Sequence, residues 1–352
     1  MDHTRWMQRC LQLARNGAGE VAPNPMVGAV LVQGDRILAE GWHRAYGGPH
    51  AEVECLRAFG DGAIPADAIM YASLEPCAHT GLTPPCTDLL IARGVRTVVV
   101  GCTDPDPRVA GMGIARLREH GITVIEHVLE EECRWTNRRF ITSIEQQRPY
   151  IILKWARSSD GFLDRHPQEL RSAVRISCLA TDVLVHRWRS EEQGIMVGSR
   201  TIVNDDPRLD VRHVAARSPL RVVLDRNAAS PKGSKVFTDG GPTLLFATKQ
   251  RDELSVEQYL IDPKDEPLEA LLKELHRRKI RSVLVEGGGE LLTHFFRLGL
   301  WDEAREIVGD VLLQHGTVAP RMANPPTRSF TSDVDRIHLY SRQNTPDPAW
   351  SW

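Results

Sequence analysis

One histidine and two cysteines in the first quarter of the chain have the residue types and the order of a zinc-ligand set. They are His50, Cys77 and Cys86. One imidazole and two thiolates fill three corners of a tetrahedral zinc site and leave the fourth for water, which is typical of catalytic zinc. Glu52, two residues after the histidine, is placed to move a proton from that water to a leaving amine. The pattern predicts hydrolytic deamination, although any one of these residues alone would more often be a packed core residue.

The spacing of the cysteines departs from the general signature of zinc nucleobase deaminases. That signature is His-x-Glu followed by Pro-Cys-x-x-Cys, whereas eight residues separate Cys77 from Cys86 here. Residues 81–85 read Gly-Leu-Thr-Pro-Pro, a composition typical of turns. We therefore expect the longer loop to return the second thiol to the metal.

Composition limits the classes of function. A chain of 352 residues is long enough for two domains, and 26% charged with 41% hydrophobic residues is ordinary for a globular protein. The 44 basic and 46 acidic residues give a net charge of −2 without a dense basic run, which disfavours a nucleic-acid partner. No stretch approaches the roughly 18 apolar residues of a membrane helix. An odd cysteine count and a beginning without the apolar core of a signal peptide favour a reducing, cytoplasmic setting.

The elements that must position the ligands alternate between strand and helix patterns. In order, these are a helix capped by Thr4, strands 27–32 and 37–42 joined by a turn at Gly34-Asp35, a helix over 50–59, strand 69–74, a helix from Cys86, strand 95–100, a helix over 114–120 and strand 122–125. This alternation predicts a sheet covered on both faces, with the site at the strand ends. His50 and Glu52 can share a site only at the irregular entry of their helix, because residues two apart on a regular helix point about 200° apart. Asn24 and His43 flank the first two strands and could hold a ring substrate.

A second domain is predicted to begin near residue 147. Residues 129–146 have the pattern of a charged connecting helix, and Gln147-Arg148-Pro149 is a boundary between domains 1–146 and 147–352. Further on, strand 282–285 leads through Glu286 into three glycines and a helix over 290–296. Such a turn can present backbone N–H groups to phosphate, although three glycines after a strand are also often a simple turn.

These segments together resemble the family of bifunctional riboflavin-biosynthesis deaminase/reductases. The motifs of the first half are Asn24-Pro25-x-Val27-Gly28, Gly41-x-His43, Pro49-His50-Ala51-Glu52-Val53, Leu74-Glu75-Pro76-Cys77, Thr83-Pro84-Pro85-Cys86 and Asp104-Pro105-x-Pro107. Those of the second half are Lys154-x-Ala156-x-Ser158-x-Asp160-Gly161, Gly198-x-x-Thr201-x-x-x-Asp205-Asp206-Pro207-x-Leu209-x-x-Arg212 and the segment from Glu286. The resemblance implies a cytidine-deaminase-like three-layer α/β/α domain followed by a dihydrofolate-reductase-like α/β domain. It also implies Zn²⁺, NADPH and a phosphoribosylaminopyrimidine substrate, and the family shares the eight-residue cysteine gap.

The resemblance assigns roles by position. Catalysis would fall to Glu52 and Asp205, zinc binding to the three ligands above, and substrate binding in the deaminase to Asn24, His43 and His79. The cofactor would contact Ala156, Arg175, Thr201, Asp205, Gly288, Gly289, Glu290, Leu291, Leu292, Thr293 and His294. The reductase substrate would contact Lys154, Arg189, Leu209, Arg212 and Glu286, where the arginine fork suits a phosphate.

One stretch departs from the family pattern. Many members carry Ser-x-Trp-Ile-Thr where this chain reads Ala173-Val174-Arg175-Ile176-Ser177. Arg175 in place of tryptophan either contacts the cofactor phosphates or impairs the reductase. Two alternatives remain at this point: a deaminase whose reductase-like domain serves only oligomer contacts, and a zinc-stabilised binding module without catalysis. We also expect a homo-oligomer, a dimer or tetramer, and a mobile tail over residues 344–352.

Overall fold

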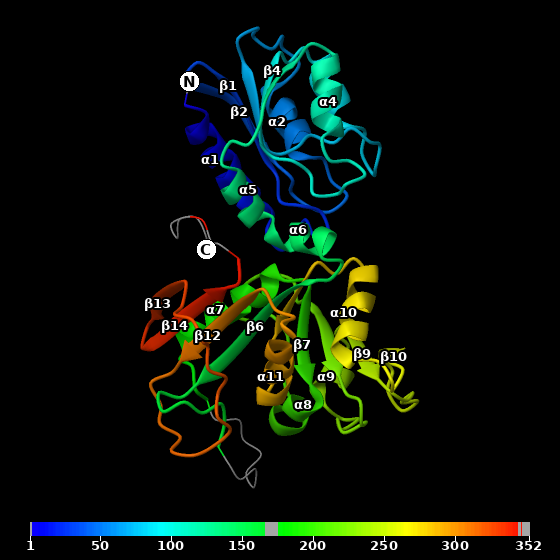
Figure 1. Ribbon diagram of the computed structural model, residues 1–352, viewed down its shortest axis with the longest axis vertical. Helices are drawn as coiled ribbons and strands as arrows, with labels where there is room; N and C mark the ends of the chain where they lie inside the picture. Colours follow the sequence, from blue (N-terminus) through cyan, green and yellow to red (C-terminus); the bar gives the residue numbers. More distant parts are fainter. Residues whose placement is uncertain (1, 166–174, 344–345, 347–352) are drawn as a thin grey trace. The chain divides into compact units, whose positions relative to one another are not determined.

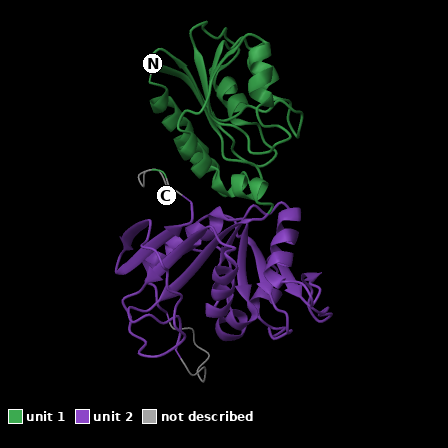
Figure 2. Cartoon of the chain, viewed as in Figure 1, with its two compact units in different colours: residues 1–147, 346–352 green, residues 148–345 purple. Residues whose placement is uncertain are grey.

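The chain divides into two compact units, shown in the computed structural model of Figures 1 and 2. The structure describes residues 2–165, 175–343 and 346. Unit 1 comprises residues 1–147 with 346–352 and unit 2 residues 148–345, so the division falls inside the Gln147-Arg148-Pro149 segment. Ala173, Val174 and the tail residues 344–352 other than Pro346 lie outside the described residues.

Unit 1 is built on a five-stranded sheet of order β2-β1-β3-β4-β5. The strands are β1 (Gly28–Gln33), β2 (Arg36–Trp42), β3 (Ile69–Leu74), β4 (Thr97–Cys102) and β5 (Thr123–Ile125). β1 pairs antiparallel with β2 and β3, and the pairs β3–β4 and β4–β5 are parallel. In β1, Ala29 and Leu31 face one core and Val30 and Val32 the other, because side chains alternate along a strand.

Helices cover both faces of this sheet. They are α1 (His3–Ala14), the short 3₁₀ helix η1 (Arg15–Gly17), α2 (Ala51–Phe59), α3 (Cys86–Ala92), α4 (Met112–Glu119), α5 (Glu130–Thr136) and α6 (Arg138–Glu145). α2, α3 and α4 contribute to the core on one face, and α1 and α5 to the core on the other. The resulting three-layer α/β/α arrangement confirms the expected fold of the first half.

Two details of the helices differ from the sequence prediction. The N-cap of α1 is Asp2, whose carboxylate accepts the backbone N–H of Thr4, so Thr4 lies inside the helix. The predicted connecting helix over 129–146 is two helices that meet at Asn137. The Asn137 side chain accepts a hydrogen bond from the backbone N of Met26 at 2.8 Å and donates one to its carbonyl at 3.0 Å. This pairing with a distant segment accompanies the break between α5 and α6.

Unit 2 is built on a nine-stranded sheet of order β10-β9-β8-β7-β11-β6-β12-β14-β13. Its strands are β6 (Tyr150–Arg157), β7 (Gly194–Gly198), β8 (Leu220–Leu224), β9 (Thr243–Ala247), β10 (Glu257–Leu260), β11 (Ser282–Val285), β12 (Glu303–Val308), β13 (Arg328–Ser332) and β14 (Asp335–Ser341). All pairs from β10 to β12 are parallel, whereas β14 is antiparallel to β12 and β13.

The helices of unit 2 also lie on both faces of their sheet. They are α7 (Leu179–Glu191), α8 (Ser199–Asp205), α9 (Lys235–Thr238), α10 (Pro267–Arg277) and α11 (Gly289–Leu298). α10 and α11 pack on one face, and α7, α8 and α9 on the other. The carboxyl ends of β6, β11, β7 and β8 therefore lie in a row, the edge at which open parallel sheets bind ligands. Among the described residues, no helix is both long and apolar enough to cross a membrane.

Candidate functional site

Three ligand atoms converge in unit 1. Nδ1 of His50 lies 3.5 Å from Sγ of Cys77 and 3.3 Å from Sγ of Cys86, and all three atoms lie within 4.8 Å of one another. Nitrogen and sulfur ligands around one tetrahedral zinc stand about 3.6 Å apart, given the usual bond lengths. The two nitrogen–sulfur distances therefore match those of a zinc-ligand set. A hydrogen bond from Cys86 and the nearby imidazole lower the pKa of the Cys77 thiol, which favours the thiolate that a metal requires.

The backbone around these ligands explains their convergence. His50 is the N-cap of α2 and has an extended backbone, with φ −72° and ψ 166°, while Cys86 is the first residue of α3. Strand β2 packs tightly against α2 because Gly41 has no side chain. A Cβ at that position would lie 2.3 Å from the backbone N of Cys55. The irregular helix entry expected from the spacing of His50 and Glu52 is thus present.

Glu52 is buried beside the ligands. It lies in the first turn of α2, has 3% of its surface exposed, and forms a hydrogen bond with the Cys86 thiol. Burial raises the pKa of Glu52, and the charge of Cys77 adds to this although His50 opposes it. A carboxyl with a raised pKa can accept a proton and return it near neutral pH.

Asn24 and His43 form a hydrogen-bonded pair next to the ligand histidine. Nδ1 of His43 lies 2.9 Å from the carbonyl of Pro49, and its Nε2 lies 3.2 Å from Nδ2 of Asn24. Burial lowers the pKa of His43, which favours the neutral ring. Because a carbonyl only accepts, Nδ1 carries the proton and Nε2 accepts from the Asn24 amide. His79, the third predicted substrate contact, is exposed on the loop between the cysteines.

Sequence reasoning assigned no role to Glu75, which organises the loop behind Cys77. Its buried carboxylate accepts four backbone hydrogen bonds, from Asp104 at 3.1 Å, Gly111 at 2.9 Å, Gly113 at 2.8 Å and Ile114 at 3.2 Å. The sequence feature that could have indicated this role is the acid directly before Pro-Cys. Nothing in the local sequence, however, reveals hydrogen-bond partners 29 to 39 residues away.

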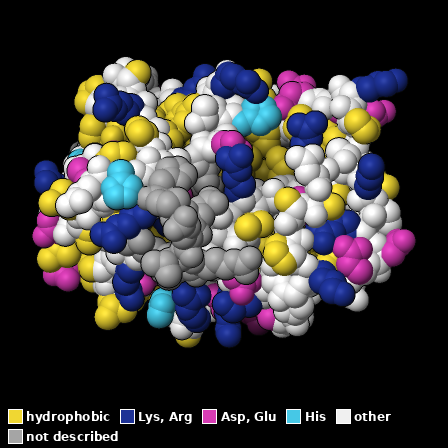
Figure 3. Space-filling model, turned by 90° about the horizontal axis from the view of Figure 1, so that it is seen from below, with side chains coloured by type: hydrophobic (Ala, Val, Ile, Leu, Met, Phe, Trp, Pro, Cys, Tyr) yellow, Lys and Arg dark blue, Asp and Glu magenta, His cyan; other side chains and the backbone are white. Residues whose placement is uncertain are grey.

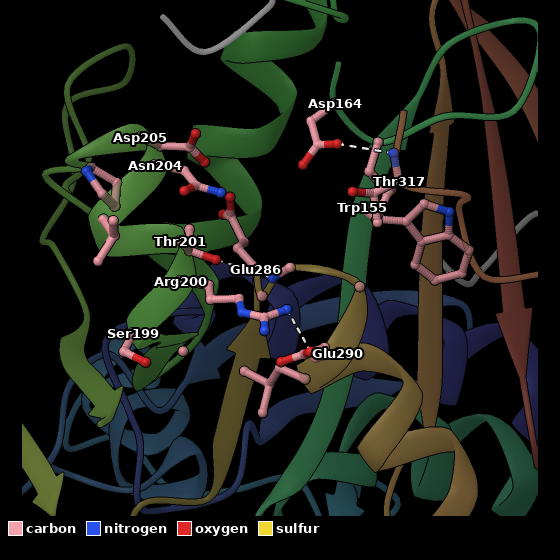
Figure 4. A pocket seen from close by; sticks show the side chains of 18 of the residues that line it. Trp155, Asp164, Ser199, Arg200, Thr201, Asn204, Asp205, Glu286, Glu290 and Thr317 are labelled. Atoms are coloured by element: carbon pink, nitrogen blue, oxygen red, sulfur yellow. Dashed lines mark hydrogen bonds and ion pairs between the residues drawn. The ribbon is translucent and has the colours of Figure 1, made fainter. Parts of the chain in front are cut away.

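A cavity of ≈ 1230 Å³ opens at the strand ends of unit 2 (Figure 4). It is lined by the ends of β6, β7, β8 and β11 together with α8 and the start of α11. Most residues predicted for the second site line it: Lys154, Ala156, Arg175, Arg189, Thr201, Asp205, Leu209, Glu286, Gly288, Gly289, Glu290, Leu291 and His294.

Three predicted residues do not line this cavity. Leu292 is fully buried in the core under α11, and Thr293 is exposed on the same helix. A run of seven consecutive residues cannot share one face of a helix with 3.6 residues per turn, so only part of the run faces the cavity. Arg212 pairs with Asp210 at 2.5 Å outside the cavity lining.

Glu286 holds two cations at the base of the cavity. Its carboxylate accepts from Nε and Nη2 of Arg189 at 2.7 and 2.9 Å, and Nζ of Lys154 lies 3.4 Å away. Burial opposes ionisation, but the two cations outweigh it and hold the pKa of Glu286 well below its usual range. Arg189 also donates to the carbonyl of Asp210 at 3.0 Å. Sequence reasoning found all three side chains but not this pairing.

Two carboxylates lie on opposite sides of the cavity. Figure 4 shows Asp205 beside Asn204 on α8, with Asp164 across from them. Burial, reinforced by the charge of Asp164, raises the pKa of Asp205. Thr201, also on α8, accepts the backbone N–H of Gly288 at 3.1 Å and so links α8 to the glycine turn. Sequence reasoning did not single out either residue, because Asp164 lies in no motif and Asn204 occupies an unspecified position of the motif that ends in Arg212.

Arg175, which replaces the family's tryptophan, lines the same cavity. Its Nε donates to the carbonyl of Ser177 at 3.0 Å, and its guanidinium pairs with Asp182 near the start of α7. The side chain is 56% exposed, so this ion pair is weak and can be exchanged for another anion.

Comparisons with known proteins agree for both halves of the chain. The cytidine and deoxycytidylate deaminase zinc-binding region matches residues 1–102, and the RibD C-terminal domain matches residues 149–322. The riboflavin biosynthesis protein RibD of Aquifex aeolicus is 37% identical over 319 residues, which is 88% of each chain. The structure of a diaminohydroxyphosphoribosylaminopyrimidine deaminase/5-amino-6-(5-phosphoribosylamino)uracil reductase from Thermotoga maritima is 35% identical, with a TM-score of 0.85 over 96% of this chain and 97% of that one. RibD of Acinetobacter baumannii is 34% identical, with a TM-score of 0.86 over 97% of this chain and 99% of the other.

Proposed function

The chain belongs to the RibD family of riboflavin biosynthesis proteins, and we propose that the ligand site of unit 1 and the cavity of unit 2 each serve one of its two activities. It is a bifunctional enzyme. It deaminates 2,5-diamino-6-(5-phosphoribosylamino)pyrimidin-4(3H)-one to 5-amino-6-(5-phosphoribosylamino)uracil with zinc, and then reduces the ribosyl group to ribityl with NADPH. The convergence of His50, Cys77 and Cys86 beside Glu52 supports the placement of the deaminase most directly.

In the deaminase site, His50, Cys77 and Cys86 would hold zinc. When bound, the metal activates a water for attack on the ring carbon that carries the amine. Glu52 would take a proton from that water onto its carboxylate and deliver it to the departing nitrogen, which leaves as ammonia. The buried position of Glu52 and its raised pKa support this shuttle.

Asn24 and His43 would orient the pyrimidine. Because Nδ2 of Asn24 donates to His43, its Oδ1 is left to accept from an amino or N–H group of the ring. His43 contributes by fixing that amide, and its bond to Pro49 holds the residue next to the ligand His50. His79, which is exposed on the loop between the cysteines, would contact the more distal part of the substrate.

In the reductase site, the cavity would hold the nicotinamide cofactor and the phosphoribosylamino substrate together. NADPH supplies a hydride for C1′ of the sugar. Asp205 would donate its proton to the ring oxygen of the ribose as that bond to C1′ breaks, which its raised pKa favours. Lys154 and Arg189, positioned by Glu286, would face the substrate. Backbone N–H groups of the glycine turn would meet the cofactor phosphates at the start of α11.

Incubation of the purified protein with the diaminopyrimidinone substrate tests both activities. Without NADPH, the product should show replacement of one NH by O. With NADPH, the product should gain two further hydrogens. If deamination occurred without any substrate-dependent oxidation of NADPH, the reductase assignment would be wrong, and an unchanged substrate in both reactions would contradict the deaminase.

We also propose a cytoplasmic homo-oligomer, either a dimer or a tetramer. Leu179 and Val183, one turn apart on α7, are 68% and 45% exposed, and an apolar stripe of this kind supports a contact between copies. Light scattering with size-exclusion chromatography measures the mass directly. A monomer at micromolar concentration would contradict the proposal.

A further inference from the structure

Six cationic side chains line the cavity of unit 2, and four of them form ion pairs with carboxylates. Lys154 and Arg189 share Glu286, Arg175 is paired with Asp182, and Arg200 with Glu290 at 2.5 Å. Within residues 2–165, 175–343 and 346, the remaining two cations, Arg165 and Arg226, make no ion pair. The proposed cofactor and substrate both carry phosphates, and these two side chains can donate hydrogen bonds to a phosphate without first leaving a carboxylate.

Arg226 projects from a firmly held turn just beyond the end of β8. The preceding residue, Asp225, is fully buried and accepts hydrogen bonds from Ala229 at 2.9 Å and Ser230 at 3.0 Å, and it pairs with Arg251 at 3.1 Å. The carbonyl of Arg226 itself accepts from the Thr248 hydroxyl at 2.7 Å. The backbone is thereby fixed while the guanidinium stays exposed, so little backbone entropy is lost when it binds an anion.

The order of the strands places Arg226 at one end of the cavity. Lys154 and Glu286, on β6 and just after β11, mark the reacting end, and Asp205 is the last residue of α8. The glycine turn after β11 lies next, and β7 and β8 follow it across the sheet. Two strand spacings, roughly 10 Å, separate β11 from β8. A cofactor with its nicotinamide near Asp205 and its diphosphate at the glycine turn would have its adenosine near the ends of β7 and β8.

We propose that Arg226 binds the 2′-phosphate of NADPH and that this contact sets the preference for NADPH over NADH. The inference rests on the proposed placement of the reductase in unit 2. An arginine fork donates two parallel hydrogen bonds to a phosphate, whereas a 2′-hydroxyl offers it no charge to bind. An arginine near the adenosine ribose serves the same purpose in other open parallel sheets. Basic side chains are scattered over the face of the molecule in Figure 3, so it is the position of Arg226 in the cavity, not charge alone, that singles it out.

Binding measured by calorimetry on the full-length protein tests the proposal without relying on turnover. The variants are Arg226→Ala, Arg226→Lys and the control Lys249→Ala, which removes an exposed cation outside the cavity lining. The probes are NADPH, NADH, adenosine 2′,5′-bisphosphate and 5′-AMP. We expect Arg226→Ala to lower the affinity for NADPH and for the bisphosphate by about 10- to 100-fold. The affinity for NADH and for 5′-AMP should stay within about twofold of that of the unaltered protein. Arg226→Lys should recover part of the loss, and Lys249→Ala should change nothing.

Two results would overturn the inference. One is an equal loss of affinity for NADPH and NADH in Arg226→Ala, which would mean that the side chain stabilises the fold or contacts the adenine. The other is unchanged NADPH affinity. Both differ from a failure of the proposed function itself, in which the unaltered protein would bind neither NADPH nor the bisphosphate.

Discussion

The substitution Glu75→Gln should destabilise unit 1 strongly, although glutamine has nearly the same shape as glutamate. One oxygen of Glu75 accepts from Gly113 and Ile114, and the other accepts from Asp104 and Gly111. A glutamine must place an NH₂ group against one of these pairs of donors. Two hydrogen bonds to a charged acceptor are then lost, at about 1.5–3 kcal/mol each, so we expect a cost of about 3–6 kcal/mol. That is a large fraction of the roughly 5–15 kcal/mol by which domains are stable.

Urea unfolding of the full-length protein measures this cost. With two units the chain need not unfold in a single step. The unfolding of unit 1 should therefore be monitored through zinc release, and that of unit 2 through loss of NADPH binding. In Glu75→Gln, only the unfolding of unit 1 should shift to a lower urea concentration. Glu119→Gln is the matched control, because Glu119 is an exposed carboxylate at the end of α4. A change below about 1 kcal/mol for Glu75→Gln would refute the claim that this carboxylate holds the loop behind Cys77.

Three further outcomes follow from the two sites. Glu52→Gln should retain zinc, measured by metal analysis, but lose deamination, because the ligand set is intact and the proton carrier is gone; near-normal turnover would contradict this role. Asp205→Asn should slow NADPH oxidation with deamination unchanged, and an equal fall in both activities would argue against separate sites. The pKa of Glu286 is depressed in the folded protein. Its stabilising contribution is therefore fully present above the unfolded pKa of about 4.3 and is lost as pH falls toward the folded value. Unit 2 should lose stability in acid more steeply than a Glu286→Gln variant, and parallel pH curves would refute this.

The zinc site could be predicted from the sequence because its chemistry is local. His50 and Glu52 belong to one helix entry, and the Pro-Cys motifs at Cys77 and Cys86 follow a strand and open a helix. The strands of unit 1 were predicted within two residues for the same reason, since each is a short apolar run between turn residues. Thr4 is a good capping residue and the sequence therefore predicts it as the cap, but Asp2 is the N-cap and its side chain accepts the backbone N–H of Thr4.

The features that the sequence did not reveal depend on contacts between distant residues. Nothing near Glu286 indicates that Arg189, 97 residues away, will occupy both of its oxygens. Likewise, the glycine turn predicts a phosphate site but not which side of the following helix faces it. The prediction of cofactor contacts includes Leu292 for that reason, but Leu292 is fully buried in the core under α11. Arg226 belongs to no sequence motif, and only its position after β8 in the folded sheet brings it to the cavity.

The bond between Asn137 and Met26 has a practical consequence for dissecting the protein. Met26 leads directly into the first strand, and its backbone N–H and carbonyl are both satisfied by a side chain 111 residues later. A deaminase fragment that stopped at residue 102, where the zinc-binding family match ends, would leave both groups without this partner at the entrance to the sheet. An autonomous front half must run at least past Asn137, so the shortest gene fragment worth expressing extends well beyond Cys86, the last of the three proposed zinc ligands.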